Sequence, residues 1–197
     1  PDYFVVDVTD GFVSAVENKS LRKRLAASKG PNFGTAYLKG CQAWTTERRT
    51  LGQQLQATLE ELIQFDEVIL NRDRTVENTN LLWNGECCYP IDHSLALKVY
   101  SQTESTYQKL LGDPLLQDEE IEAHICSSLL AWKGLAFDVI GEKWRNEPVD
   151  EILEEMRDVL PDEWESSGGD YDRIFDFLER REHHLEAIVD QLTRLLS

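Results

Sequence analysis

Apolar residues along the chain follow two periodicities, one typical of strands and one typical of helices. Tyr3–Val8 is a run of aromatic and β-branched residues and predicts a short strand. Between residues 46 and 70, leucine and isoleucine recur every three or four positions, and toward the end apolar residues surround the whole helix. Such a helix is expected to lie buried at the centre of a domain. It would lead the chain directly to Asn71.

The same periodicity predicts further helices on both sides of this central one. They cover residues 13–27, 119–144, Val149–Val159 and 170–196, the last starting at an N-capping Asp170 after two glycines. Residues 29–34 hold two glycines and a proline, and this density of helix and strand breakers predicts a loop. The chain is therefore expected to be mainly helical.

A hairpin signal follows the central helix. Leu81–Trp83 and residues 87–89 are short strand-like runs, separated by a segment that contains Asn84 and Gly85. The Asn-Gly dipeptide tolerates the positive φ angles of a tight hairpin turn, so the two runs are predicted to pair. Asp92 stands just beyond the second run.

Charge and cysteine content narrow the classes of function. The formal net charge of −17 argues against binding to nucleic acid or to an anionic membrane, because both depend on lysine and arginine neutralising phosphates. The short cluster Arg22, Lys23 and Arg24 is interpreted as the solvated face of a helix. The four cysteines form no C-x-x-C motif and are expected to be reduced, so a cytoplasmic location is expected. The sequence contains no signal-peptide pattern and no run long enough to span a bilayer.

The strongest candidates for chemistry lie around the hairpin. Asp73, Asn78 and Asp92 offer two carboxylates and an amide oxygen, which is the kind of ligand set that magnesium takes beside phosphates. A loop carrying Asp73 and Asn78, with Asp92 entering from the hairpin, would preorganise these groups for phosphoryl transfer. The alternative is a polar loop that only caps a helix and starts a turn.

The pattern D-R-x-x-x-N followed by I-D resembles the HipA-like kinases and, more distantly, the phosphatidylinositol kinases. The resemblance implies Asp73 as the catalytic aspartate, Asn78 as a metal ligand and Asp92 as the principal metal ligand, with ATP and Mg²⁺ as cofactors. It also implies one domain over residues 1–197 with the fold of a protein-kinase-like C-lobe. That lobe is mainly α (α+β), with a small β-hairpin carrying the metal-binding aspartate.

Three flanking segments add to the resemblance. They are Asn32-Phe33-Gly34-Thr35-Ala36-Tyr37-Leu38, Phe65-Asp66 and Leu160-Pro161-Asp162-Glu163-Trp164, similar to the family's F-G-S-x-x-L, F-D and I-P-x-E-W segments. The family's N-lobe carries a glycine loop and an ATP-binding lysine, and neither motif is found in this sequence. The chain begins at Pro1 without a methionine, and we expect an N-lobe to be supplied by upstream sequence.

The resemblance implies ATP- and Mg²⁺-dependent phosphoryl transfer to a serine or threonine of a protein by a bacterial or phage toxin-like or regulatory kinase. Its partners would be ATP and a protein substrate or cognate protein. One alternative is a protein-binding module derived from a kinase C-lobe without catalysis. Another is a small-molecule or lipid kinase, although the acidic composition disfavours anionic lipid substrates.

Three residues beside the predicted ligands have open roles. Arg72 and Arg74 could contact phosphate or orient the loop, or could form structural salt bridges, for example to Glu67 or Glu77. His93 could tune the site or could pack and form hydrogen bonds locally.

The remaining polar residues are expected to be structural. His124 is expected to pack in the core, and the adjacent pair His183 and His184 is expected at the surface, since it lacks the i, i+4 spacing of a helical metal site. Ser94 and the serine and threonine residues at 103, 105 and 106 could be autophosphorylation targets, but a solvated loop is the default interpretation.

Overall fold

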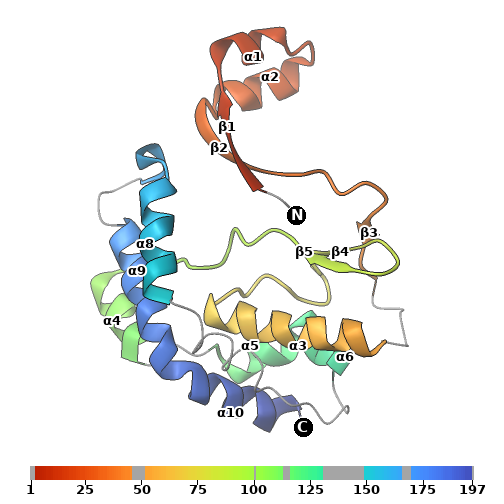
Figure 1. The fold of residues 1–197 in the computed structure, drawn as a ribbon, viewed down its shortest axis with the longest axis vertical. Helices are drawn as coiled ribbons and strands as arrows, with labels where there is room; N and C mark the ends of the chain where they lie inside the picture. Colours follow the sequence, from red (N-terminus) through yellow and green to blue (C-terminus); the bar gives the residue numbers. More distant parts are fainter. Residues whose placement is uncertain are drawn as a thin grey trace.

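The computed structural model describes residues 3–45, 52–99, 101–112, 116–130, 149–165 and 170–196. The described chain is mainly helical and carries two small antiparallel sheets, as expected from the sequence. One sheet and two short helices project from the top of Figure 1, and the remaining helices lie below the second sheet and to its left. We call residues 3–35 the N-terminal unit and the rest of the described chain the helical body.

The N-terminal unit is a two-stranded ribbon with a helical tip. β1 (Tyr3–Val8) has the predicted bounds and pairs antiparallel with β2 (Gly30–Thr35), so that Val6 lies opposite Asn32. The prediction of a loop over residues 29–34 is therefore wrong. Pairing along the full length of β1 outweighs the local tendency of glycine and proline to break a strand.

The single helix predicted over residues 13–27 is also wrong, because two short helices lie there. They are α1 (Asp10–Ala15) and α2 (Lys19–Ala26). The side chain of Asn18 accepts a hydrogen bond from the backbone N–H of Leu21 at 3.0 Å and so starts a new helix. The apolar periodicity continues across this cap and conceals the break.

The second sheet has the strand order β3-β4-β5 and contains the predicted hairpin. β3 is Gln42–Ala43, β4 is Leu81–Trp83 and β5 is Cys88–Pro90. A four-residue loop joins β4 to β5: the side chain of Asn84 accepts hydrogen bonds from two backbone N–H groups, and Gly85 has a φ of 107°. The hairpin prediction is confirmed, and glycine meets the need for a positive φ at this turn.

The central helix α3 (Gln53–Val68) lies below this sheet in Figure 1. It ends two residues before the predicted boundary, and residues 46–51 of the predicted helix lie outside the described chain. Leu59, Ile63 and Val68 are at most 2% exposed. They belong to one core with residues of α6 (Ile125–Leu130) and α10 (Leu185–Leu196), which confirms the burial expected for this helix.

The other helices pack around this core. They are α4 (Glu104–Gly112), α5 (Asp118–Ala123), α8 (Val149–Val159), the 3₁₀ turn η1 (Asp162–Trp164), α9 (Asp170–Arg181) and the 3₁₀ turn η2 (Glu182–His184). The bounds of α8 are those predicted. α4 occupies part of the segment expected to be a solvated loop, because Tyr107 and Leu111 give it a buried face.

Two predicted long helices are interrupted. The helix predicted over 119–144 breaks at His124, whose ψ of 137° is extended, and its continuation beyond residue 130 lies outside the described chain. The helix predicted over 170–196 is divided into α9 and α10 by η2, so His183 and His184 lie in a turn. His183 is exposed and His184 is half-buried.

A hydrogen bond joins the N-terminal unit to the helical body. The indole N–H of Trp164 in η1 donates to the carbonyl oxygen of Pro31 at 2.7 Å. The last residue of one family-like segment, Trp164, therefore contacts the residue that precedes another, Asn32–Leu38. No helix of the described chain has the length and apolar character needed to cross a membrane.

Candidate active site

The loop that follows α3 begins with a sharp change of backbone direction. Leu70 has a positive φ of 51°, and the backbone N–H of Asn71 donates to the carbonyl oxygen of Asp66 at 2.8 Å. Further along, Thr75 and Asn78 close a turn through two hydrogen bonds, one of them from the Asn78 N–H to the Thr75 hydroxyl at 3.2 Å. The loop from Asn71 to Asn78 therefore has a defined backbone conformation.

This loop brings Asp73 and Asn78 together. The side-chain amide of Asn78 donates to the backbone carbonyl of Asp73 at 3.3 Å. Asn80 donates to the same carbonyl at 3.3 Å and to the Asp73 carboxylate at 3.1 Å. Asp73 is half-buried, whereas Asn78 is exposed. The carboxylate of Asp73 is held in one orientation, and the amide oxygen of Asn78 makes none of the hydrogen bonds described for the loop.

Asp92 lies on the neighbouring segment, two residues after β5. It is exposed and has a φ of 53°, an uncommon backbone conformation for a residue other than glycine. Hydrogen bonds from the side chain and the backbone of Ser94 lower the pKa of Asp92 below its ordinary value. The group is therefore an ionised carboxylate at neutral pH, which is the form that binds a metal.

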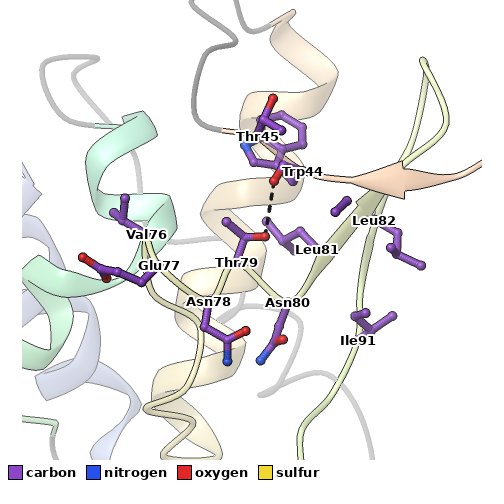
Figure 2. Close-up of a pocket in the computed structure, with 11 residues that line it drawn as sticks. Trp44, Thr45, Val76, Glu77, Asn78, Thr79, Asn80, Leu81, Leu82 and Ile91 are labelled. Carbon is purple, nitrogen blue, oxygen red and sulfur yellow. Dashed lines mark hydrogen bonds between the residues drawn. The ribbon is translucent and has the colours of Figure 1, made fainter.

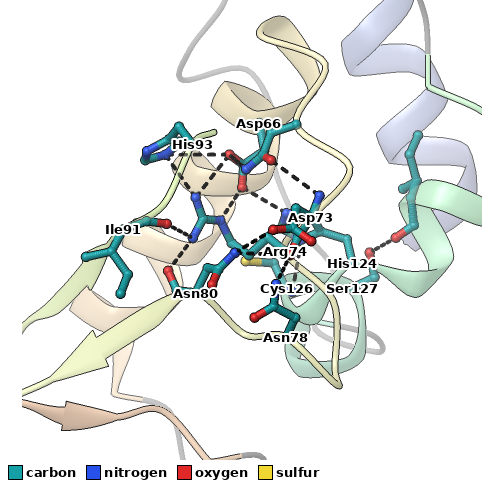
Figure 3. A network of polar contacts seen from close by, with 12 residues as sticks. Asp66, Asp73, Arg74, Asn78, Asn80, Ile91, His93, His124, Cys126 and Ser127 are labelled. Carbon is teal, nitrogen blue, oxygen red and sulfur yellow. Dashed lines mark hydrogen bonds and ion pairs between the residues drawn. The ribbon is translucent and has the colours of Figure 1, made fainter. Parts of the chain in front are cut away.

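A buried ion pair lies between these two segments (Figure 3). Asp66 of α3 and Arg74 of the loop are both fully buried, and the Arg74 Nε donates to an Asp66 carboxylate oxygen at 2.5 Å. The two Nη1 hydrogens reach the backbone carbonyls of Asn80 and, at 3.3 Å, of Ile91. The Nη2 group donates to Asp66 at 3.4 Å and to His93 at 2.9 Å. These contacts use all five guanidinium N–H donors, which leaves none for a phosphate.

His93 completes the contacts of Arg74. Because a guanidinium can only donate, the Nε2 atom of His93 must be the acceptor, so the ring is neutral with its proton on Nδ1. Burial and the neighbouring charge of Arg74 both lower the pKa of His93, in agreement with this form. The ring also makes an edge contact with Phe65, with centroids 5.9 Å apart.

The Asp66 carboxylate receives two further hydrogen bonds. His124 lies 3.0 Å from one oxygen through its Nε2 atom, and its Nδ1 atom accepts from the backbone N–H of Cys126. The side-chain amide of Asn71 donates to the other oxygen at 2.8 Å. Burial alone would raise the pKa of Asp66, but the hydrogen bonds from His124 and Arg74 lower it, so this carboxylate is ionised.

Arg72 lies on the outer side of the same loop. Its Nε atom is 3.2 Å from a carboxylate oxygen of Glu120, and half of its side chain is exposed. The salt-bridge partners of the two arginines are therefore Glu120 and Asp66, rather than the Glu67 or Glu77 considered from the sequence.

Two cavities flank the hairpin. The larger, about 860 Å³, has apolar walls that include Leu38, Leu82 and Ile91, and it reaches Asp92 and His93. The other, about 590 Å³, includes Asn78 and is shown in Figure 2. Leu82 and Ile91 line both cavities. The candidate metal ligand Asn78 borders the smaller cavity, and the candidate metal ligand Asp92 borders the larger one.

The donor chemistry of Asp73, Asn78 and Asp92 fits a hard divalent cation, since all three present oxygen atoms. Within the described ranges, no group of three His, Cys, Asp or Glu side chains is close enough to hold a metal. The arrangement instead offers two ionised or oriented carboxylates on neighbouring segments and one amide oxygen. That set suits a cation whose remaining ligands come from a phosphate-bearing substrate and water.

Three residues of this site, Asp66, Asn80 and His124, were not singled out as site residues from the sequence. Asp66 stands beside Glu67 in an otherwise apolar stretch of helix, and two such carboxylates are a recognisable signal for buried polar contacts. Asn80 and His124 gave no such signal. The contact of His124 with Asp66 joins residues 58 positions apart and depends on the tertiary fold.

Comparison with protein families identifies the family of this chain. A family model described as HipA-like kinase matches residues 1–194, almost the whole chain. No curated protein and no solved structure matches.

Proposed function

Because the chain belongs to the HipA-like kinase family, we propose that it transfers the γ-phosphoryl group of ATP to a serine or threonine hydroxyl of a protein. Kinase-type chemistry is what family membership suggests. The observation that carries the proposal is the Asp66–Arg74 pair, which holds the loop of Asp73 and Asn78 against the carbonyl of Ile91, next to Asp92. Phosphoryl transfer depends chiefly on such positioning and on charge stabilisation.

We assign the nucleotide base and sugar to the cavity of about 860 Å³. Its volume suits a ligand of this size, and Leu38, Leu82 and Ile91 offer apolar surface to a purine ring. Asp92 lies at the same cavity, where the phosphates would meet the metal. Mg²⁺ bound by Asp92 and Asn78 would neutralise charge on the phosphate oxygens.

Asp73 is the proposed catalytic aspartate. Its carboxylate, oriented by Asn80, accepts the proton of the attacking hydroxyl. The hydroxyl oxygen forms a bond to the γ-phosphorus while the bond from that phosphorus to the β–γ bridging oxygen breaks, and ADP leaves. We further propose that a glycine loop and a lysine covering the phosphates come from an N-lobe outside residues 1–197, as the family resemblance implies.

The test is phosphate transfer from ATP radiolabelled at the γ-position, measured for Asp73→Ala and Asp92→Ala in the complete protein. We expect each variant to lose at least about 100-fold in rate, because each removes a group that acts on the transferring phosphoryl. Asp172→Ala is the control, since Asp172 pairs with Arg157 at an exposed position.

Normal transfer by both variants would reject the site. A wild-type protein that neither transfers phosphate nor binds Mg²⁺–ATP in calorimetry would instead favour the non-catalytic binding module.

A further inference from the structure

We infer that Asp66 is a positioning residue for phosphoryl transfer, acting through Arg74 on the Asp92 segment and through Asn71 on Asp73. The inference rests on the proposed function. Asp66 lies on α3 and is fully buried, so it contacts no substrate. Its importance would come from its contacts with both Arg74 and Asn71, which lead to the two halves of the candidate site.

The first connection leads to Asp92. Arg74 binds Asp66 through Nε and Nη2 and uses Nη1 for the carbonyls of Asn80 and Ile91. These carbonyls flank the hairpin, and the Ile91 N–H also donates to the Asn80 carbonyl at 2.9 Å. A planar guanidinium has five N–H donors in a fixed fork, enough for both carboxylate oxygens of Asp66, two carbonyls and His93, whereas a lysine ammonium has only three. Arg74 therefore connects the Asp73 loop directly to the segment of Asp92.

The second connection leads to Asp73. Asn71 donates to Asp66 through its side-chain nitrogen and accepts from the backbone N–H of Asp73 through its side-chain oxygen, at 2.8 and 3.3 Å. The amide of Asn71 therefore transmits the position of Asp66 to the backbone of the catalytic candidate. Asp66 accepts four hydrogen bonds in total, which uses the acceptor capacity of an ionised carboxylate.

The charge of Asp66 is essential to this arrangement. In Asp66→Asn, one oxygen becomes an NH₂ group that can only donate, and it would face the N–H donors of Arg74, His124 or Asn71. A buried arginine without its counter-charge is strongly unfavourable, so Arg74 would move and release the carbonyls of Asn80 and Ile91. Asp73 and Asp92 would remain in the sequence but lose their mutual placement.

The experiment compares Asp66→Asn with Leu192→Ala in the full chain. Leu192 is a fully buried residue of α10, so its truncation lowers stability without touching the Asp66 contacts. At a temperature where both variants are folded, we expect Asp66→Asn to lose about 10- to 100-fold in kcat or in Mg²⁺ affinity, with the KM for ATP little changed. Leu192→Ala should keep the wild-type kcat. Equal kcat values together with equal Mg²⁺ affinities for the two variants would overturn the inference.

Two further measurements keep the test decisive. If Asp66→Asn does not fold, Asn71→Ala removes only the link to Asp73 and should lower kcat without changing the KM for ATP. Amide hydrogen exchange at residues 72–80 and 91–94 should accelerate in Asp66→Asn but not in Leu192→Ala, whether or not the protein is active. An inactive wild type with this exchange pattern would reject the proposed function while retaining the positioning role. If the wild type is active but Asp66→Asn has unchanged exchange and unchanged kcat, the positioning role is rejected and the proposed function is retained.

Discussion

The N-terminal unit and the helical body use similar apolar residues in opposite ways. In the ribbon, Tyr3 is 75% exposed and Phe33 is 66% exposed, although both lie in regular paired strands. In the body, Leu81 of β4 is 1% exposed and packs into the common core. A run of apolar residues can therefore form a regular strand without being buried. The N-terminal unit buries Val8 and Val13, whereas the large common core of the described chain lies in the body.

Charged residues of the two regions also differ in how far their side chains are exposed to water. Lys29 and Asp10 form an ion pair at the surface of the N-terminal unit, with exposed side chains. The body instead encloses Asp66, Glu67, Arg74 and Arg181, and it can do so because hydrogen bonds and opposite charges accompany them. The region that carries Asp73, Asn78 and Asp92 is also the region that encloses these four ionisable groups.

The largest expected difference between the two regions is in the stability that is lost when a leucine is truncated to alanine. Leu81→Ala is expected to lower the free energy of unfolding by about 3–5 kcal/mol, because it leaves a cavity in the core. Leu21→Ala in α2 of the N-terminal unit should change it by less than about 0.5 kcal/mol, since Leu21 is 45% exposed. Urea denaturation of both variants measures the difference. Similar losses would mean that the N-terminal unit is as tightly packed as the body.

The next largest expected effect is in the pH dependence of stability, to which the buried Glu67 of the body contributes. Burial raises the pKa of Glu67 from 4.5 to about 7, against the opposing effect of its hydrogen bond with the Leu116 N–H. Between these pH values the unfolded chain has lost the proton that the folded protein keeps, so this group lowers the free energy of unfolding as pH rises. Above pH 7 the loss reaches a plateau.

Glu67→Gln is neutral at every pH and should escape this loss. Its stability relative to wild type is expected to rise by about 2–3 kcal/mol from pH 4.5 to 7.5, as measured by urea denaturation across that range. A flat difference curve for Glu67→Gln would show that Glu67 is ionised in the folded protein.

The smallest expected effect concerns the hydrogen bond from Trp164 of the body to Pro31 of the N-terminal unit. Trp164→Phe keeps an aromatic ring in η1 but removes the N–H that donates to Pro31. The loss of one hydrogen bond, about 1 kcal/mol, should accelerate amide exchange in β1 and β2 about fivefold and leave α3 unchanged.

Tyr107→Phe is the control for this exchange measurement. It removes a hydrogen bond to Asp176 within the body and should not affect the ribbon. Unchanged exchange of the ribbon in Trp164→Phe would mean that other contacts hold it to the body.

The sequence was most informative where local chemistry decides the structure. The strand Tyr3–Val8, the helix Val149–Val159 and the Asn84 turn all follow from propensity and pattern. It failed where pairing or capping overrides the pattern, as in β2 and at Asn18.

The same distinction between local and long-range information applies to the candidate site. Asp73, Asn78 and Asp92 could be proposed from their spacing and from a family resemblance, and their roles stay predictions. The contacts that orient them could not be read in this way, because Arg74 reaches Ile91 17 positions away and Asp66 reaches His124 58 positions away. Short sequence windows do not contain such information.

The late position of His124 has a consequence for biosynthesis. Asp66 and Arg74 emerge from the ribosome well before His124 and before Ile125, whose N–H donates to the Arg74 carbonyl at 2.9 Å. Until that second segment is synthesised, the ion pair lacks part of its hydrogen bonding and the wall that excludes water from it. During translation the loop of Asp73 therefore acquires its final shape only after α5 and α6 have left the exit tunnel, so a prematurely released chain would carry the catalytic candidates in an unfinished loop.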